Sequence, residues 1–255
     1  VRAYGVPVKS MTSLLPMFTP EINVLSDKPN KYGKRFPNIS NKREYTCYQV
    51  VDPAGARNYS AIWAGVNAKG EVYIRSEFPD RNTYGEWAIF GEPKWRYGPA
   101  SKKIGYNIEG YVNLFKQIEE DLDIEVFERI GDSRYFARQN EDNDDLFTSF
   151  YDYGMNFVPS DGRMEAVGIA SLDDWFSYNP NVEIDMSNQP MCYIHEDCGN
   201  LIDSIINYNS NGKNDEALKD FFDLIRYLRM ANGGDGPDHQ DEHSLVTTIR
   251  GKGGY

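Results

Sequence analysis

The sequence has few cysteines and no long apolar run. Its 255 residues include three cysteines, Cys47, Cys192 and Cys198, so a disulfide framework is not expected and a reducing compartment is indicated. Cys192, His195 and Cys198 lie close together in sequence, but the fourth ligand of a zinc site is missing at any standard spacing. Buried thiols beside a strand are therefore the favoured interpretation. No apolar run approaches the roughly 18–20 residues of a membrane span, so no membrane association is expected.

Nucleotide-binding loops are absent from the sequence as well. It contains no G-x-x-x-x-G-K-[ST] segment and no G-x-G-x-x-G after a predicted strand, so any ATP-driven activity is expected outside this chain. The chain starts at Val1 without a charged-then-apolar leader, which suggests a fragment of a longer protein. With 27 basic against 39 acidic residues, the net charge of −12 argues against a broad basic surface for nucleic acid. It leaves room for a local basic strip or a divalent-cation site.

The order of predicted elements indicates an α/β fold. Residues 1–43 contain five prolines and are expected to form an irregular connecting or wrapping segment. Strands are predicted at 45–51, 60–66, 71–78, 124–131 and 191–194, and helices at 107–122, 163–177, 197–208 and 214–231. The first three strands are joined by tight links and should form an antiparallel meander, extended by parallel crossover units into a mixed sheet flanked by helices. Residues 44–231 are thus the expected folded domain, and 232–255 a flexible C-terminal tail.

Acidic residues stand at positions that could converge in this fold. Asp52 ends the first strand before Pro-Ala-Gly, and Asp132 directly follows the fourth strand. If those strands are neighbours, both carboxylates lie at one edge of the sheet. Asp220 and Asp223 share a helix face separate from the apolar stripe of 214–231. Each acid alone is more commonly a turn, cap or solvated residue.

Carboxylates held close together repel one another unless cations lie between them. Two divalent ions ~3.5–4 Å apart could bind a scissile phosphate, generate hydroxide and stabilise the leaving oxygen. Basic residues could supply the contacts to DNA phosphates. The predicted loop 90–103 carries Lys94, Arg96, Lys102 and Lys103 among aromatic residues, although an ordinary solvated loop is equally compatible. Arg57 could meet a phosphate beside the metals or pair with a neighbouring acid.

With these residues placed, the chain resembles the C-terminal, RNase H-like nuclease domain of the large terminase subunit of tailed bacteriophages. The stretches that carry the resemblance are VRAYGVPVKSMTSLLPMF (1–18), VVDPAGARNYSAIWAGVNAKGEVYI (50–74), RIGDSR (129–134), QPMCYIHEDCGNLIDSIINY (189–208) and EALKDFFDLIRYL (216–228). The resemblance implies that Asp52 and Asp132 are the first two metal ligands, and that Asp220, Asp223 or both supply the third. Many family members have two adjacent acids where this chain has Lys219-Asp220.

The resemblance also implies a function and partners. The expected activity is Mg²⁺- or Mn²⁺-dependent, sequence-tolerant cleavage of concatemeric double-stranded DNA during genome packaging, by a two-metal site, in the cytoplasm of the infected bacterial host. The implied partners are DNA, an ATPase domain of the same polypeptide preceding residues 1–43, the small terminase subunit and the portal. Two alternatives stay open: a noncatalytic DNA clamp or docking module of the packaging motor, and another RNase H-like nuclease such as a resolvase or transposase.

Overall fold

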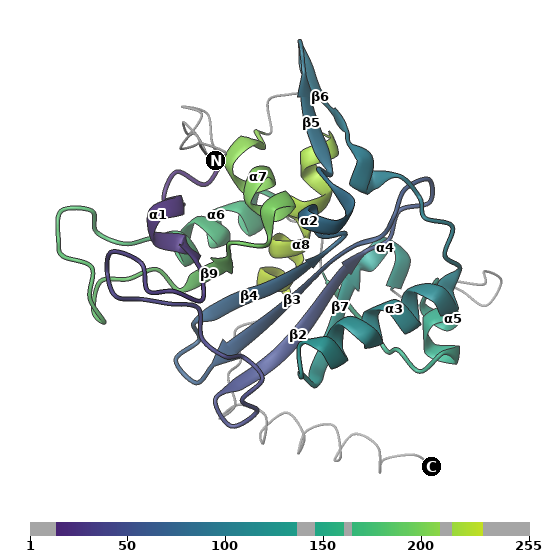
Figure 1. Cartoon of the computed structure of the whole chain (residues 1–255), viewed down its shortest axis with the longest axis horizontal. Coiled ribbons are helices and arrows are strands. Elements are labelled where there is room, and N and C mark those ends of the chain that lie inside the picture. Colours follow the sequence, from purple (N-terminus) through teal and green to yellow (C-terminus); the bar gives the residue numbers. More distant parts are fainter. Residues whose placement is uncertain (1–13, 137–145, 161–164, 210–215, 232–255) are drawn as a thin grey trace.

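A central mixed sheet organises the chain (Figure 1). The computed structural model describes residues 14–136, 146–160, 165–209 and 216–231; the predicted tail 232–255 lies outside them. The sheet has seven strands in the order β1-β9-β4-β3-β2-β7-β8. Their bounds are Val24–Leu25 (β1), Tyr45–Asp52 (β2), Ser60–Asn67 (β3), Val72–Phe78 (β4), Val126–Asp132 (β7), Val158–Ser160 (β8) and Cys192–His195 (β9).

The pairing of the strands confirms the predicted mixed sheet. Strands β2, β3 and β4 form the antiparallel meander, and β7 lies parallel to β2, with β8 parallel to β7. On the other side β9 lies parallel to β4, and β1 parallel to β9. The chain therefore places β2 and β7 side by side within the sheet, although they are far apart in sequence.

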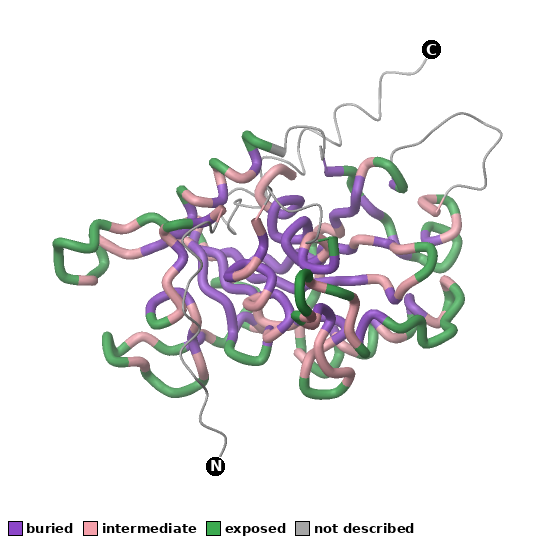
Figure 2. Tube along the Cα trace, turned by 90° about the horizontal axis from the view of Figure 1, so that it is seen from above, coloured by how far each residue is buried: buried purple, intermediate pink, exposed green. Residues whose placement is uncertain are grey.

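Helices cover both faces of the sheet (Figure 1). The main helices are α3 (Ile108–Asp121), α4 (Ser133–Phe136), α5 (Leu146–Asp152), α6 (Glu165–Phe176), α7 (Gly199–Asn207) and α8 (Glu216–Met230). Consecutive strand residues point to opposite faces, so Val50 packs with α6, α7 and α8, whereas Val51 packs with α3 and α5. Because both faces are covered, the central strands are buried along most of their length, and Figure 2 shows buried chain through the middle of the molecule.

Short elements depart from the sequence prediction. Within residues 14–43, expected to be irregular, α1 (Pro20–Asn23) and β1 are regular and β1 joins the edge of the sheet. The predicted loop 90–103 instead begins with a β-hairpin of β5 (Ala88–Gly91) and β6 (Lys94–Tyr97), which projects from the body (Figure 1). A four-residue helix α2 (Arg81–Tyr84) and a 3₁₀ turn (Pro99–Ser101) flank this hairpin. None of the described helices is long and apolar enough to span a membrane.

Candidate active site

Asp52 and Asp132 lie next to each other at one edge of the sheet. In the parallel pair of β2 and β7, Val51 is opposite Gly131, and the next residue on each strand is an aspartate. Strand β7 continues through Asp132, one residue further than predicted. The aromatic ring of Phe136 packs against Gly131 so closely that a Cβ there would lie 2.0 Å from it. This packing fixes the backbone that carries Asp132.

Helix α8 brings the other two acids to the same edge. Its predicted apolar stripe, Leu218, Phe221, Phe222, Ile225 and Leu228, is buried. A different face of α8 carries Asp220, Asp223 and Tyr227. The Tyr227 hydroxyl donates a hydrogen bond to Asp132 Oδ2 at 2.8 Å, and the Tyr227 carbonyl accepts one from Ser160 Oγ at 3.1 Å. Tyr227 therefore ties α8 to the ends of β7 and β8.

The charges of the four acids act on one another. Burial raises the pKa of Asp52 well above its usual range, and the negative charges of Asp220, Asp223 and Asp132 raise it further. Burial also raises the pKa of Asp220 to about 6, against the opposing influence of Arg57. The other three acids predicted from the sequence are thus within electrostatic reach of Asp52, and together the four concentrate negative charge at this edge.

Three of these acids are each paired with an arginine. The pairs are Asp132 with Arg134, Asp223 with Arg226, and Asp220 with Arg57. Asp132 accepts hydrogen bonds from the backbone N–H of Arg134 at 2.8 Å and from its Nε at 2.7 Å, and a further one from its Nη2. Burial acts to raise the pKa of Asp132, but these bonds and that from Tyr227 outweigh burial and hold the pKa below its ordinary value.

The two acids of α8 are each paired with an arginine as well. Buried Asp223 accepts two hydrogen bonds from Arg226, from Nε at 3.0 Å and Nη2 at 2.8 Å. Asp220 forms an ion pair with Arg57 Nε at 3.3 Å, and the Arg57 guanidinium lies over the Tyr97 ring at 4.1 Å. Of the two alternatives considered for Arg57, pairing with a neighbouring acid is the one observed.

The acids have the chemistry to hold a hard divalent cation, although the arginines now occupy them. Carboxylate oxygens from β2, β7 and α8 are the ligands that Mg²⁺ and Mn²⁺ prefer. Asp220 Oδ2 is buried and makes no hydrogen bond in the part of the chain that the structure describes. As the side chains lie, however, no group of three or more His, Cys, Asp or Glu among the described residues is arranged to hold a metal. In this arrangement three of the four acids are paired with arginines.

Two of the predicted basic residues lie near the acids, and the other two lie on the projecting hairpin. Lys94 and Arg96 are exposed on β6, and Lys102 and Lys103 are exposed just after it. Lys103 Nζ donates to the carbonyl of Gly55 at 3.0 Å, in the loop that follows Asp52. Residues 102–103 thus contact the loop that leaves β2, which places basic side chains near the acidic edge.

Two functional candidates were not singled out from the sequence. Arg134 stands two residues after Asp132, and Arg226 stands three residues after Asp223 on a helix, a spacing at which side chains meet. That helical spacing was an available signal for the Arg226 pair. The zinc site that the sequence disfavours has no support within the ranges that the structure describes, where no three His, Cys, Asp or Glu are grouped to hold a metal. Cys192 and Cys198 are buried free thiols, as expected.

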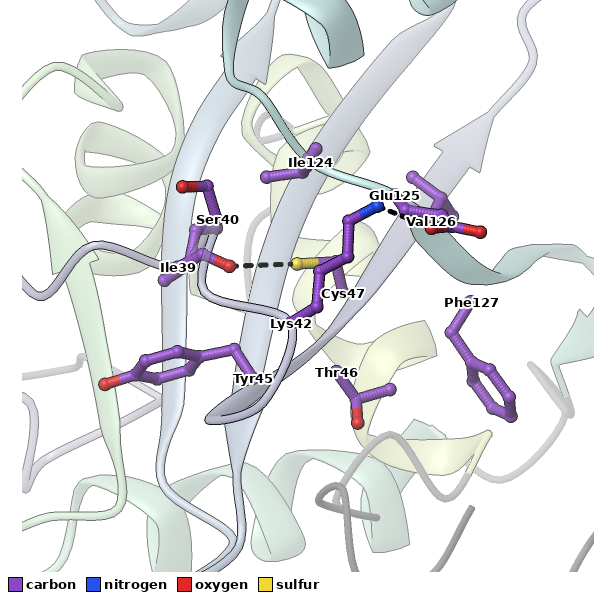
Figure 3. A pocket seen from close by; sticks show the side chains of 10 residues that line it. All are labelled: Ile39, Ser40, Lys42, Tyr45, Thr46, Cys47, Ile124, Glu125, Val126 and Phe127. Carbon is purple, nitrogen blue, oxygen red and sulfur yellow. Dashed lines mark hydrogen bonds and ion pairs between the residues drawn. The ribbon is translucent and has the colours of Figure 1, made fainter. Parts of the chain in front are cut away.

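A separate pocket lies at the other end of β2 (Figure 3). It has a volume of about 310 Å³ and is lined by residues 39–47 and 124–127, including the start of β2. Lys42 Nζ and Glu125 Oε2 form an ion pair at 2.7 Å across it, and Cys47 Sγ donates to the Ile39 carbonyl at 3.4 Å. It contains none of the four acids, so it is not a candidate for the active site.

Comparison with known proteins shows that this chain resembles solved structures in its fold. No family model matches the chain, and no curated protein matches it in sequence. The solved nuclease domain of the P22 large terminase is 12% identical with a TM-score of 0.54, over 87% of this chain and 93% of that one. The solved large terminase of a thermophilic bacteriophage is 15% identical with a TM-score of 0.52. That second match covers 88% of this chain and 45% of the thermophilic phage protein, so this chain spans less than half of that protein. This chain has the RNase H-like, mixed-sheet fold of the large terminase nuclease domain.

Proposed function

We propose that this chain is a divalent-metal-dependent endonuclease that cuts concatemeric double-stranded viral DNA during genome packaging. The observation that carries the proposal is the meeting of Asp52 and Asp132, at the ends of two adjacent parallel strands, with the acids of α8. The fold shared with the P22 nuclease domain supports it. The corresponding context is the cytoplasm of an infected bacterium, with an ATPase domain of the same polypeptide, the small terminase subunit and the portal as partners.

In this proposal Asp52 and Asp132 hold the cation from the sheet, and Asp220, Asp223 or both hold it from α8. Bound Mg²⁺ or Mn²⁺, in a two-metal site, would activate water and neutralise charge on the scissile phosphate. Tyr227 keeps the Asp132 carboxylate oriented through its hydrogen bond. Asp220 is the more accessible of the two helix acids, with a side chain 15% exposed against 5% for Asp223. Comparing Asp220→Asn with Asp223→Asn in metal binding identifies the third ligand.

The basic residues of the hairpin and the following segment would contact the DNA backbone. Such contacts position a duplex without reading its sequence, as a sequence-tolerant nuclease needs. Lys94, Arg96, Lys102 and Lys103 are exposed and free to approach phosphates, whereas Arg57 would first have to leave Asp220. Replacing Lys94 and Arg96 by alanine should make the plot of log affinity against log salt concentration less steep, by about 1 per lost phosphate contact.

Plasmid cleavage tests the proposed activity. Supercoiled plasmid is incubated with Mg²⁺, Mn²⁺ or EDTA and the wild-type chain, Asp52→Ala or Asp132→Ala, with Asp174→Ala on the exposed face of α6 as the matched control. Wild type and control should cut with either metal and not in EDTA, and the two site variants should not cut. Cutting that survives both site substitutions contradicts the assignment. DNA binding without cutting under any metal favours the noncatalytic clamp, and a preference for junction DNA favours a resolvase-like nuclease.

A further inference from the structure

The Oδ2 oxygen of the Asp132 carboxylate is already fully occupied. Asp132 Oδ1 accepts from the backbone N–H of Arg134, and Asp132 Oδ2 accepts from Arg134 Nε, Arg134 Nη2 and the Tyr227 hydroxyl. A carboxylate has about four lone-pair positions, two on each oxygen, so Oδ1 keeps one open whereas Oδ2 has none. A cation can therefore bind Asp132 Oδ2 only after one of its three donors leaves.

The Arg134 guanidinium is the donor that can leave most easily. The Tyr227 side chain is buried on α8, and the Arg134 backbone N–H is fixed at the start of α4. By contrast, the Arg134 side chain is 70% exposed, while Asp132 is 1% exposed. The Arg134 guanidinium already lies largely in water, so it can turn away from Asp132 without leaving a buried position, and a bound cation would replace its charge beside the buried carboxylate.

The other two arginines are held more firmly. Arg226 is buried, and its side chain lies so close to α6 that a Cβ on Gly168 would lie 2.8 Å from Arg226 Cγ. Arg57 is held between Asp220 and the Tyr97 ring. Arg134 also lies close enough to Asp52 for its positive charge to act on that acid. Its guanidinium thus supplies positive charge to both sheet acids.

We propose that the Arg134 guanidinium takes the place of a cation beside Asp132 in the metal-free protein, and moves to a DNA phosphate when a divalent cation binds. This inference rests on the proposed function and adds a positioning residue to it. A bound divalent cation repels the guanidinium, and the planar N–H groups of arginine match a phosphate in two parallel hydrogen bonds. Metal and DNA then favour each other's binding, since coupling between two ligands is reciprocal.

Mn²⁺ binding without DNA tests the first half of the exchange. Free Mn²⁺ is measured by electron paramagnetic resonance during titration of wild type, Arg134→Gln and Arg43→Gln. Arg43 is an exposed arginine before β2, at the end of the strand opposite Asp52, and controls for the loss of one positive charge. Arg134→Gln should bind Mn²⁺ about fivefold more tightly than wild type, and Arg43→Gln should not. Equal or weaker Mn²⁺ binding by Arg134→Gln overturns the inference.

DNA binding tests the second half. Anisotropy of a labelled blunt duplex is measured in Ca²⁺ and in EDTA. Ca²⁺ should raise the DNA affinity of wild type, and Arg134→Gln should lose most of that increase; an undiminished increase contradicts the exchange. Circular dichroism checks that Arg134→Gln is folded. If it is not, Arg134→Lys is used in its place, because lysine keeps the charge but lacks the paired N–H groups. Wild type that binds no Mn²⁺ overturns both this inference and the metal site, whereas unaltered binding by Arg134→Gln overturns the exchange alone.

Discussion

Replacing Asp220 by asparagine should stabilise the metal-free protein at neutral pH. Burial raises the pKa of Asp220 from its ordinary 3.8 to about 6, in spite of the opposing charge of Arg57. A carboxyl with a higher pKa in the folded state binds its proton more tightly there, so ionising it disfavours folding. At about 1.4 kcal/mol per pKa unit, the difference between these two pKa values corresponds to a loss of about 3 kcal/mol in the free energy of unfolding when Asp220 is ionised. Since asparagine resembles the protonated acid, Asp220→Asn should raise the free energy of unfolding by about 1–3 kcal/mol at pH 7.5.

The sign of the pH dependence distinguishes this effect from a change in packing. Urea unfolding in EDTA at pH 4, 5, 6 and 7.5 should show the full advantage of Asp220→Asn above pH 6 and almost none near pH 4, where folded Asp220 is protonated. Asp174→Asn, on an exposed part of α6, is the control and should change stability by less than about 0.5 kcal/mol. Destabilisation by Asp220→Asn at pH 7.5, or an advantage that does not vary with pH, would refute the reasoning.

Three further substitutions test how the site is held. Asp132→Asn should destabilise by about 1–3 kcal/mol at pH 7, because the pKa of Asp132 is lowered on folding. The stability contribution of Asp132 is lost as pH falls through that lowered pKa, so a urea series extended below pH 4 should show the deficit shrinking there. Tyr227→Phe removes the hydroxyl that donates to Asp132 and should lower both Mn²⁺ affinity and the free energy of unfolding, the latter by about 1–2 kcal/mol; unchanged values would rule out an orienting role. Gly131→Ala places a Cβ against Phe136 and should cost more than about 2 kcal/mol by thermal unfolding, whereas Gly55→Ala, with open space around it, should be near neutral; equal melting temperatures would contradict the packing.

Long periodic segments of the fold could be predicted from the sequence. Strands β2, β3 and β4 have seven or eight residues, mostly buried, and α3 and α8 carry apolar side chains at helical spacing. The sequence predicts a loop where the β5–β6 hairpin lies, because its four-residue strands are short and only partly buried and so show no clear pattern of apolar residues. Strands as short as β1 and β8 leave no pattern of their own, and pairing with longer strands defines them.

Part of the candidate site followed from the order of the elements. A parallel crossover from β2 to β7 brings Asp52 and Asp132 to one edge, whichever side chains surround them. The arginine pairs did not follow, because an arginine near an acid is also typical of a solvated surface. The pair of Arg57 and Asp220 joins a loop to a helix far along the chain, and only the packing of α8 brings them together.

Anomalous diffraction from crystals soaked in Mn²⁺ tests the central claim most directly. The proposed site predicts a manganese peak about 2.0–2.3 Å from carboxylate oxygens of both Asp52 and Asp132, with Asp220 or Asp223 as a further ligand. The same map should show the Arg134 side chain displaced from Asp132. A map at saturating Mn²⁺ with no peak at these acids, or with manganese bound only elsewhere, would contradict the account.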